Sequence, residues 1–174
     1  MFQRPIIVAA VGCSMACDDA IGLHLASSLD DGTVLSEAGM DMPSGILEFR
    51  RWEDADSLTV AQELLECEKP VFLIDCANMG LEGGASRTFD PDSLRCHSSS
   101  VSCHGFGMAE ALELAATLGF NLPVRIFGVQ PFDCSPSLEM TPEMMACYDR
   151  VLLECCTALN AFLLELNLCA SQSP

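Results

Sequence analysis

Two carboxylates and one imidazole stand where an α/β fold would gather ligands. Asp19 follows an apolar run and a glycine, and Asp75 closes a second apolar run. His104 stands at the start of a helical pattern. In open α/β sheets the carboxyl ends of the strands share one edge, where ligands bind. Together the three side chains form an O,O,N set that suits nickel, zinc, manganese or iron and leaves positions open for a substrate group.

Each of these residues also has a simpler interpretation. Asp18, directly before Asp19, is typical of a helix N-cap, and Asp19 is typical of a first-turn acid that the helix dipole stabilises. His104, taken alone, is typical of an ordinary first-turn histidine. Asp75 is harder to explain in this way, because a carboxylate that closes an apolar strand needs a partner.

Cysteine chemistry is an alternative at the same edge. Cys13 and Cys17 lie in the first loop and Cys103 precedes His104, so a thiolate metal site or a cysteine nucleophile remains open. However, most of the 11 cysteines stand in apolar periodic segments, where cysteine behaves as a small hydrophobic residue. The two carboxylates after Cys17 would also raise its pKa. We therefore expect reduced thiols that take no part in catalysis.

Composition excludes several classes of function. The 174 residues include 8 basic and 25 acidic side chains, and the resulting charge of −17 repels phosphate backbones and anionic lipid. We expect no binding to nucleic acid or to membranes, and a preference for a basic partner or a cation. No signal peptide and no apolar run of roughly 20 residues is found, so we expect a soluble cytoplasmic protein. Dinucleotide and phosphate-loop fingerprints and a Gly-x-Ser-x-Gly elbow are all missing from the sequence.

Apolar periodicity predicts the elements that would position these residues. Strand-like runs cover residues 6–11, 33–36, 71–75 and 123–129, with an edge strand at 85–89. Helical patterns cover residues 21–29, 44–51, 58–65, 102–119 and 141–166, and the expected N-caps are Asp56–Ser57, Ser102 and Thr141. This order predicts an α/β three-layer sandwich, in which helices flank a mixed, twisted sheet of about five strands. We expect one domain over residues 1–174, with a frayed tail from about residue 168.

Four sequence marks resemble the hydrogenase maturation proteases, which trim the large subunit of nickel–iron hydrogenases. The first is AVGCSMACDDAIG, which matches the family's first loop through Gly12, the acidic pair and Gly22. The others are FLIDCANMGLEGG, which contains Asp75, then Ser-Cys-His at 102–104, and Gly-Val-Gln-Pro at 128–131. The order and spacing of the four marks agree with the family along nearly the whole chain.

The resemblance implies a function and a set of site residues. Asp19, Asp75 and His104 would be the catalytic and metal-contacting set. The metal would be the nickel of the large-subunit precursor, although other divalent metals could replace it in vitro. The enzyme, expected as a monomer, would read that nickel as a sign of completed assembly and remove a C-terminal peptide. The alternative is a docking or metal-binding protein in hydrogenase assembly that does not cleave.

Several parts of the sequence depart from the family pattern, among them Cys17, which stands directly before the acidic pair. Cys13 replaces the asparagine after Gly12, and Ala10 replaces the first glycine of the loop. The segment 36–39, Ser-Glu-Ala-Gly, replaces a glycine-rich loop that the resemblance implies to contact the substrate. The replaced loop leaves open which hydrogenase is served, and the Cys13 change could add a thiolate beside the site.

Overall fold

The fold is built on one sheet of five strands. The computed structural model describes residues 4–40, 43–95 and 107–171. Its strands are β1 (Ile6–Gly12), β2 (Leu47–Glu53), β3 (Val71–Cys76), β4 (Ser86–Phe89) and β5 (Val124–Val129), in the order β2-β1-β3-β5-β4. β2, β1, β3 and β5 are parallel, and β4 pairs antiparallel with β5 at the edge. The prediction of a mixed five-stranded sheet is confirmed.

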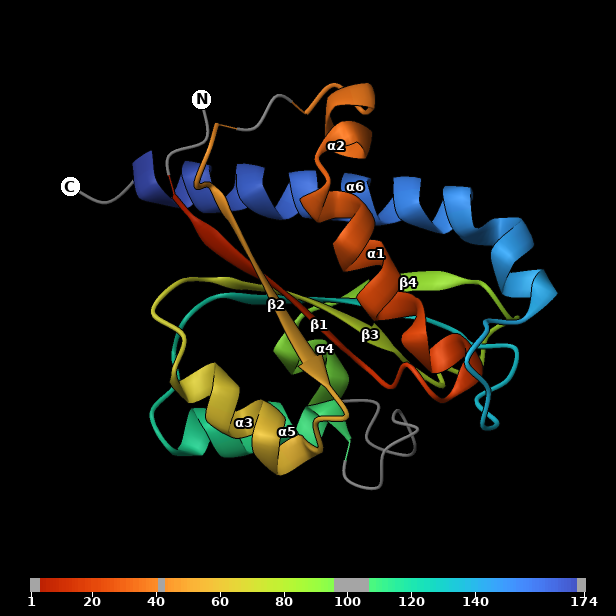
Figure 1. The fold of residues 1–174 in the computed structure, drawn as a ribbon. Coiled ribbons are helices and arrows are strands. Elements are labelled where there is room, and N and C mark those ends of the chain that lie inside the picture. Colours follow the sequence, from red (N-terminus) through yellow and green to blue (C-terminus); the bar gives the residue numbers. More distant parts are fainter. Residues whose placement is uncertain (1–3, 41–42, 96–106, 172–174) are drawn as a thin grey trace.

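Helices cover both faces of the sheet (Figure 1). One face carries the 3₁₀ helix η1 (Cys17–Ala20), α1 (Ile21–Asp30), α2 (Thr33–Glu37) and α6 (Pro142–Ser171). The opposite face carries α3 (Ser57–Leu65), α4 (Pro91–Arg95) and α5 (Met108–Thr117). Across the described residues, no helix combines the length and the apolar character that crossing a bilayer would require.

The three layers follow from the strands that are apolar on both faces. All seven residues of β1 are buried. Because successive strand residues face opposite sides, Ile6 and Val8 join the core under α1 and α6, whereas Ile7 and Ala9 join the core under α3 and α5. β3 is divided between the two cores in the same way. Strands of this kind are stable only with helices on both sides.

Two predicted elements between β1 and β3 are wrong. Residues 33–36 were expected as a strand, but they form α2, which begins after Gly32 in a left-handed conformation and buries Leu35 against the core. Residues 44–51 were expected as a helix, but β2 begins within them and pairs with β1 over its whole length. Leu47 and Phe49 alternate with charged residues, which is the period of a strand with one apolar face.

The observed starts of three helices can be compared with the N-caps that the sequence predicted. α3 begins as expected, because the Asp56 carboxylate accepts a hydrogen bond from the Thr59 N–H at 2.8 Å. α5 begins at Met108 with Gly107 at its N-cap position, and the expected cap residue Ser102 lies outside the described residues. α6 begins as expected after Thr141 and is helical through Ser171, where the described residues end; the predicted fraying of the tail stays a prediction.

Gly22 allows α1 to start directly against the ends of two strands. A β-carbon at this position would lie 2.8 Å from the Val11 carbonyl oxygen and 3.0 Å from that of Ile74. Both atoms belong to the backbone of buried strands and cannot move aside. The close approach of α1 to β1 and β3 therefore requires glycine here.

We expect Gly22→Ala to lower the free energy of unfolding by about 1–3 kcal/mol, the usual cost of overpacking a tight core. Alanine has the higher helix propensity, so at an uncrowded helix position the same change would stabilise the protein. Urea denaturation of both proteins gives the difference. A stabilised variant would show that α1 does not need this close approach.

Candidate active site at the carboxyl edge of the sheet

Asp19 is a buried carboxylate in the tight connection between β1 and α1. Its residue is only 1% exposed, and its Oδ2 accepts a hydrogen bond from the Cys13 backbone N–H at 2.7 Å. Gly12 makes this turn possible, because a β-carbon there would lie 2.2 Å from the Asp19 carbonyl oxygen. The connection therefore fixes the carboxylate at the carboxyl end of β1.

Asp75 reaches the same edge from the neighbouring strand. It is the last residue but one of β3, is 4% exposed, and pairs in register with Gly128 of β5. η1, which carries Asp19, packs against β3. Two buried carboxylates therefore belong to the same edge of the sheet. His104, the third member of the predicted set, lies outside the described residues, so the complete set stays a prediction.

Asp18 has a different role from the N-cap that the sequence suggested. Its carboxylate is fully buried and makes no cap hydrogen bond to its own helix. Instead, Oδ2 accepts hydrogen bonds from the backbone N–H groups of Phe132 and Asp133, at 2.9 and 3.2 Å. Oδ1 accepts from the backbone N–H of Thr141 at 2.8 Å, and the Thr141 hydroxyl also donates to the carboxylate. Asp18 thus fastens the first loop to the loop that follows β5.

Thr141 extends this connection into α6. Its hydroxyl donates to Asp18 and also accepts a hydrogen bond from the Met144 N–H at 3.1 Å, which caps the helix as the sequence predicted. The start of α6 is therefore hydrogen-bonded to Asp18, the residue next to Asp19. Sequence reasoning considered Asp18 and Thr141 separately and missed the contact, because 123 positions separate them.

Gln130 organises the loop after β3. Its side chain is buried, and Oε1 accepts hydrogen bonds from the backbone N–H groups of Met79 at 2.7 Å and Leu81 at 3.2 Å. Its own backbone N–H donates to Ala85, and its carbonyl accepts from Gly84. A glutamine at the end of β5 therefore holds the glycine-rich connection that begins directly after Asp75 and Cys76.

The thiols of the first loop are poor nucleophiles. The pKa of Cys13 is raised, chiefly by its hydrogen bond to the Asp54 carboxylate. The pKa of Cys17 is raised first by burial and then by the negative charge of Asp18. Both shifts keep the thiol protonated at neutral pH, and the thiolate is the reactive form. The expectation of a raised pKa for Cys17 is confirmed.

Two other cysteines lie close to Asp19. A carboxylate oxygen of Asp19 and the Sγ atoms of Cys76 and Cys134 all lie within 4.8 Å of one another. Cys76 ends β3 and Cys134 lies in the loop after β5, so three segments of the chain contribute to the group. Asp75 does not belong to it. Sequence reasoning missed Cys134, although its place just after Gln130–Pro131, at the same edge of the sheet, is a signal that could have identified it.

The model of one protein family matches more than half of the chain. The family is described as hydrogenase maturation protease (HycI), and the match covers residues 55–158, which include Asp75, Gln130 and the start of α6. The chain belongs to the hydrogenase maturation protease family. The first loop with Asp18 and Asp19 precedes the matched residues. No curated protein sequence matches the chain significantly.

Solved structures with a similar fold cover most of the chain. The hydrogenase maturating endopeptidase HybD from E. coli is 20% identical, with 90% of this chain and 93% of that chain covered and a TM-score of 0.68. The [NiFe] hydrogenase maturation protease HycI from Thermococcus kodakarensis is 17% identical over the same shares, with a TM-score of 0.63. A further endopeptidase structure from Escherichia coli has 18% identity, the same coverage and a TM-score of 0.69. At these identities the likeness shows a common fold.

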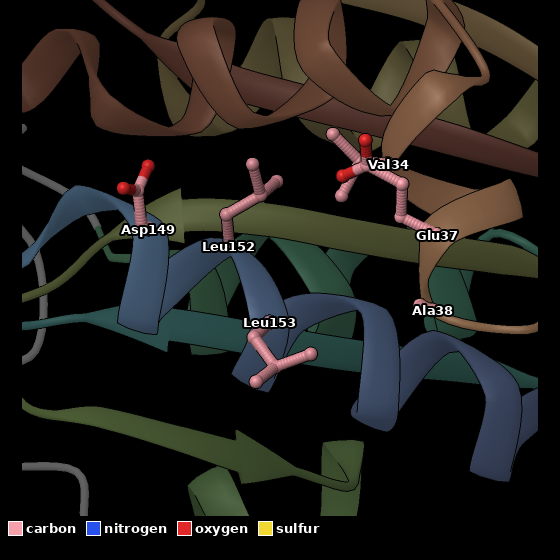
Figure 2. Close-up of a pocket in the computed structure, with 6 residues that line it drawn as sticks. All are labelled: Val34, Glu37, Ala38, Asp149, Leu152 and Leu153. Atoms are coloured by element: carbon pink, nitrogen blue, oxygen red, sulfur yellow. The ribbon is translucent and has the colours of Figure 1, made fainter.

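A surface hollow away from this edge lacks comparable chemistry. Val34, Glu37 and Ala38 line it from α2 and its end, and Asp149, Leu152 and Leu153 line it from α6 (Figure 2). The described lining contains two carboxylates but neither histidine nor cysteine. The carboxyl edge of the sheet is therefore the better candidate for the active site of this maturation protease.

Proposed function

We propose that this protein is an endopeptidase that removes a C-terminal peptide from the nickel-loaded large-subunit precursor of a nickel–iron hydrogenase. The observation that carries the proposal is the family match over residues 55–158, which contains the buried strand-end carboxylate Asp75. Asp19 supports it, because this second buried carboxylate reaches the same edge from the η1 segment that packs against β3.

In this proposal Asp19, Asp75 and His104 contact the nickel that the precursor carries. Two carboxylates and one imidazole suit a borderline divalent cation and leave positions for groups of the substrate. The nickel is part of the substrate, and its presence marks a precursor that is ready for cleavage. A cation next to the scissile carbonyl would polarise it, and a carboxylate would orient or deprotonate the attacking water.

The surface around this edge is suited to a polypeptide substrate. Met15, Phe132 and Leu138 are large apolar side chains with exposed fractions of 63%, 45% and 82%. Met15 and Leu138 lie in neighbouring segments, because the Ser137 N–H donates to the Met15 carbonyl. Apolar side chains gathered beside a site are typical of protein contact surfaces. We further propose that the chain acts as a single domain, as a monomer, in the cytoplasm.

Incubation with purified precursor tests the function and its dependence on nickel. Precursor loaded with nickel should become shorter at its C-terminus, whereas metal-free precursor should remain intact under the same conditions. Gel electrophoresis followed over time is sufficient to distinguish the two. A stable complex with uncut, nickel-loaded precursor would instead support a docking protein.

We expect Cys103→Ser to retain cleavage and His104→Ala to lose it. The two residues are neighbours, so the serine variant is a matched control for disturbance of the segment. The reason is that the proposed mechanism needs an imidazole at position 104 and no thiol nucleophile. Cleavage of the nickel-loaded precursor is the measurement. A folded Cys103→Ser protein without activity would replace the carboxylate–histidine mechanism by a cysteine mechanism.

A further inference from the structure

The group formed by Asp19, Cys76 and Cys134 has the composition of a thiolate-rich metal site. The three ligand atoms, one carboxylate oxygen and two sulfurs, lie within 4.8 Å of one another. In a tetrahedral site with metal–sulfur bonds of about 2.3 Å and metal–oxygen bonds of about 2.0–2.2 Å, the sulfur–sulfur and sulfur–oxygen distances are roughly 3.5–3.8 Å. Movements of roughly 1 Å would therefore bring the three atoms to the spacing that one bound cation requires.

Two of the three ligands are held in place by the Asp18 contacts. The backbone N–H of Asp18 donates to the Asp133 carbonyl at 3.1 Å, and the Asp18 carboxylate accepts from the Asp133 N–H. Asp18 directly precedes Asp19, and Asp133 directly precedes Cys134. These hydrogen bonds thus fix the two ligand-bearing segments relative to each other. Ligands positioned before the metal arrives raise affinity, because less ordering is required on binding.

The third ligand is fixed by the sheet. Cys76 pairs in register with Val129 of β5, and the following residue, Ala77, donates its N–H to the Val129 carbonyl at 2.9 Å. Cys76 is 1% exposed and belongs to the core under α1 and α6. Cys134 is half-buried, whereas Asp19 and Cys76 are buried.

We propose that Asp19, Cys76 and Cys134 form a binding site for a thiophilic divalent cation of the Zn²⁺ type. Two sulfur ligands distinguish this site from the Asp19, Asp75 and His104 set, which has none. Soft thiolates favour zinc over hard cations such as magnesium. The site goes beyond the proposed protease function, because the protein binds this cation without any precursor.

Binding exchanges protons for the cation. Each of the two thiols releases one proton to solvent, and the cation takes the place of both protons. Three protein ligands leave one tetrahedral position, which water can occupy.

Spectroscopic titration of the reduced, precursor-free protein with Co²⁺ tests the site. Cobalt bound by thiolates shows an intense sulfur-to-metal charge-transfer absorption that oxygen and nitrogen ligands do not produce. The band of the wild-type protein should reach its full intensity at one equivalent of Co²⁺, and added Zn²⁺ should abolish it. Cys134→Ser should lose much of the band and bind at least about tenfold more weakly, since even changes around the ligands cost 10–100-fold.

Matched variants show whether the absorption band comes from the proposed ligands. Cys67→Ser removes a thiol outside the group, because Cys67 lies between α3 and β3, before the start of the strand, so this variant should leave the band unchanged. Cys76→Ala provides a second test, and circular dichroism shows whether each variant folds. A wild-type protein without the band, or a folded Cys134→Ser protein with the wild-type band and affinity, would overturn the proposal. Precursor cleavage is not measured here, so either result is independent of the protease function.

Discussion

Asp75→Asn should lower the rate of precursor cleavage by about 10²–10⁴-fold, the range that general acid–base groups contribute. Asparagine keeps the size of the side chain at this 4% exposed position but removes the negative charge. The proposed mechanism needs that charge to contact the nickel of the precursor or to activate water. Asp19→Asn should have an effect of the same order for the same reason.

Initial rates with nickel-loaded precursor measure both effects. Asp133→Asn is a matched control, because Asp133 lies at the same edge but its side chain is exposed and its carboxylate accepts hydrogen bonds from Ser135 of the same loop. This variant should cleave at close to the wild-type rate. Asp75→Asn protein that is folded and cleaves like wild type would remove Asp75 from the catalytic set.

Asp18→Ala should lower the free energy of unfolding by about 3–5 kcal/mol, the largest loss of stability that we expect from a single change. The buried carboxylate accepts from three backbone N–H groups and one hydroxyl, which belong to Phe132, Asp133 and Thr141. Hydrogen bonds to a charged group contribute about 1.5–3 kcal/mol each, and buried donors left without an acceptor add a desolvation cost. These terms are not additive, so the expected total is below their sum.

Urea denaturation of wild type and Asp18→Ala measures this loss. Asp56→Ala is the control, because Asp56 is an N-cap whose carboxylate is exposed and accepts from one backbone N–H in the described structure. Asp56→Ala should cost clearly less than Asp18→Ala. Equal losses of unfolding free energy would show that the hydrogen bonds of Asp18 do not hold the first loop and the loop after β5 together.

Sequence patterns predicted the strands that are buried on both faces. β1, β3 and β5 are apolar runs bounded by glycine, proline or acids, and such runs have few alternatives in an α/β fold. β2 was missed because charged residues interrupt it and only its pairing with β1 decides its structure. α2 was missed because Thr33 and Val34 have strand propensity, which the packing of Leu35 overrides.

The candidate site was predictable to the extent that it depends on topology. Parallel strands end at one edge, so the placement of Asp19 and Asp75 there follows from the order of the elements. The contacts of Asp18 with Thr141, and of Asp19 with Cys134, join segments more than a hundred residues apart. No local pattern encodes such contacts, because they depend on how the loop after β5 folds back over η1.

Mass spectrometry of the precursor after incubation with the wild-type protein tests the central claim, that the chain is an endopeptidase, most directly. Hydrolysis of one peptide bond adds one water molecule. With nickel-loaded precursor we therefore expect a shortened large subunit and a C-terminal peptide whose masses sum to that of the precursor plus one water. Precursor that keeps its full mass while it stays bound to the folded wild-type protein would contradict the claim.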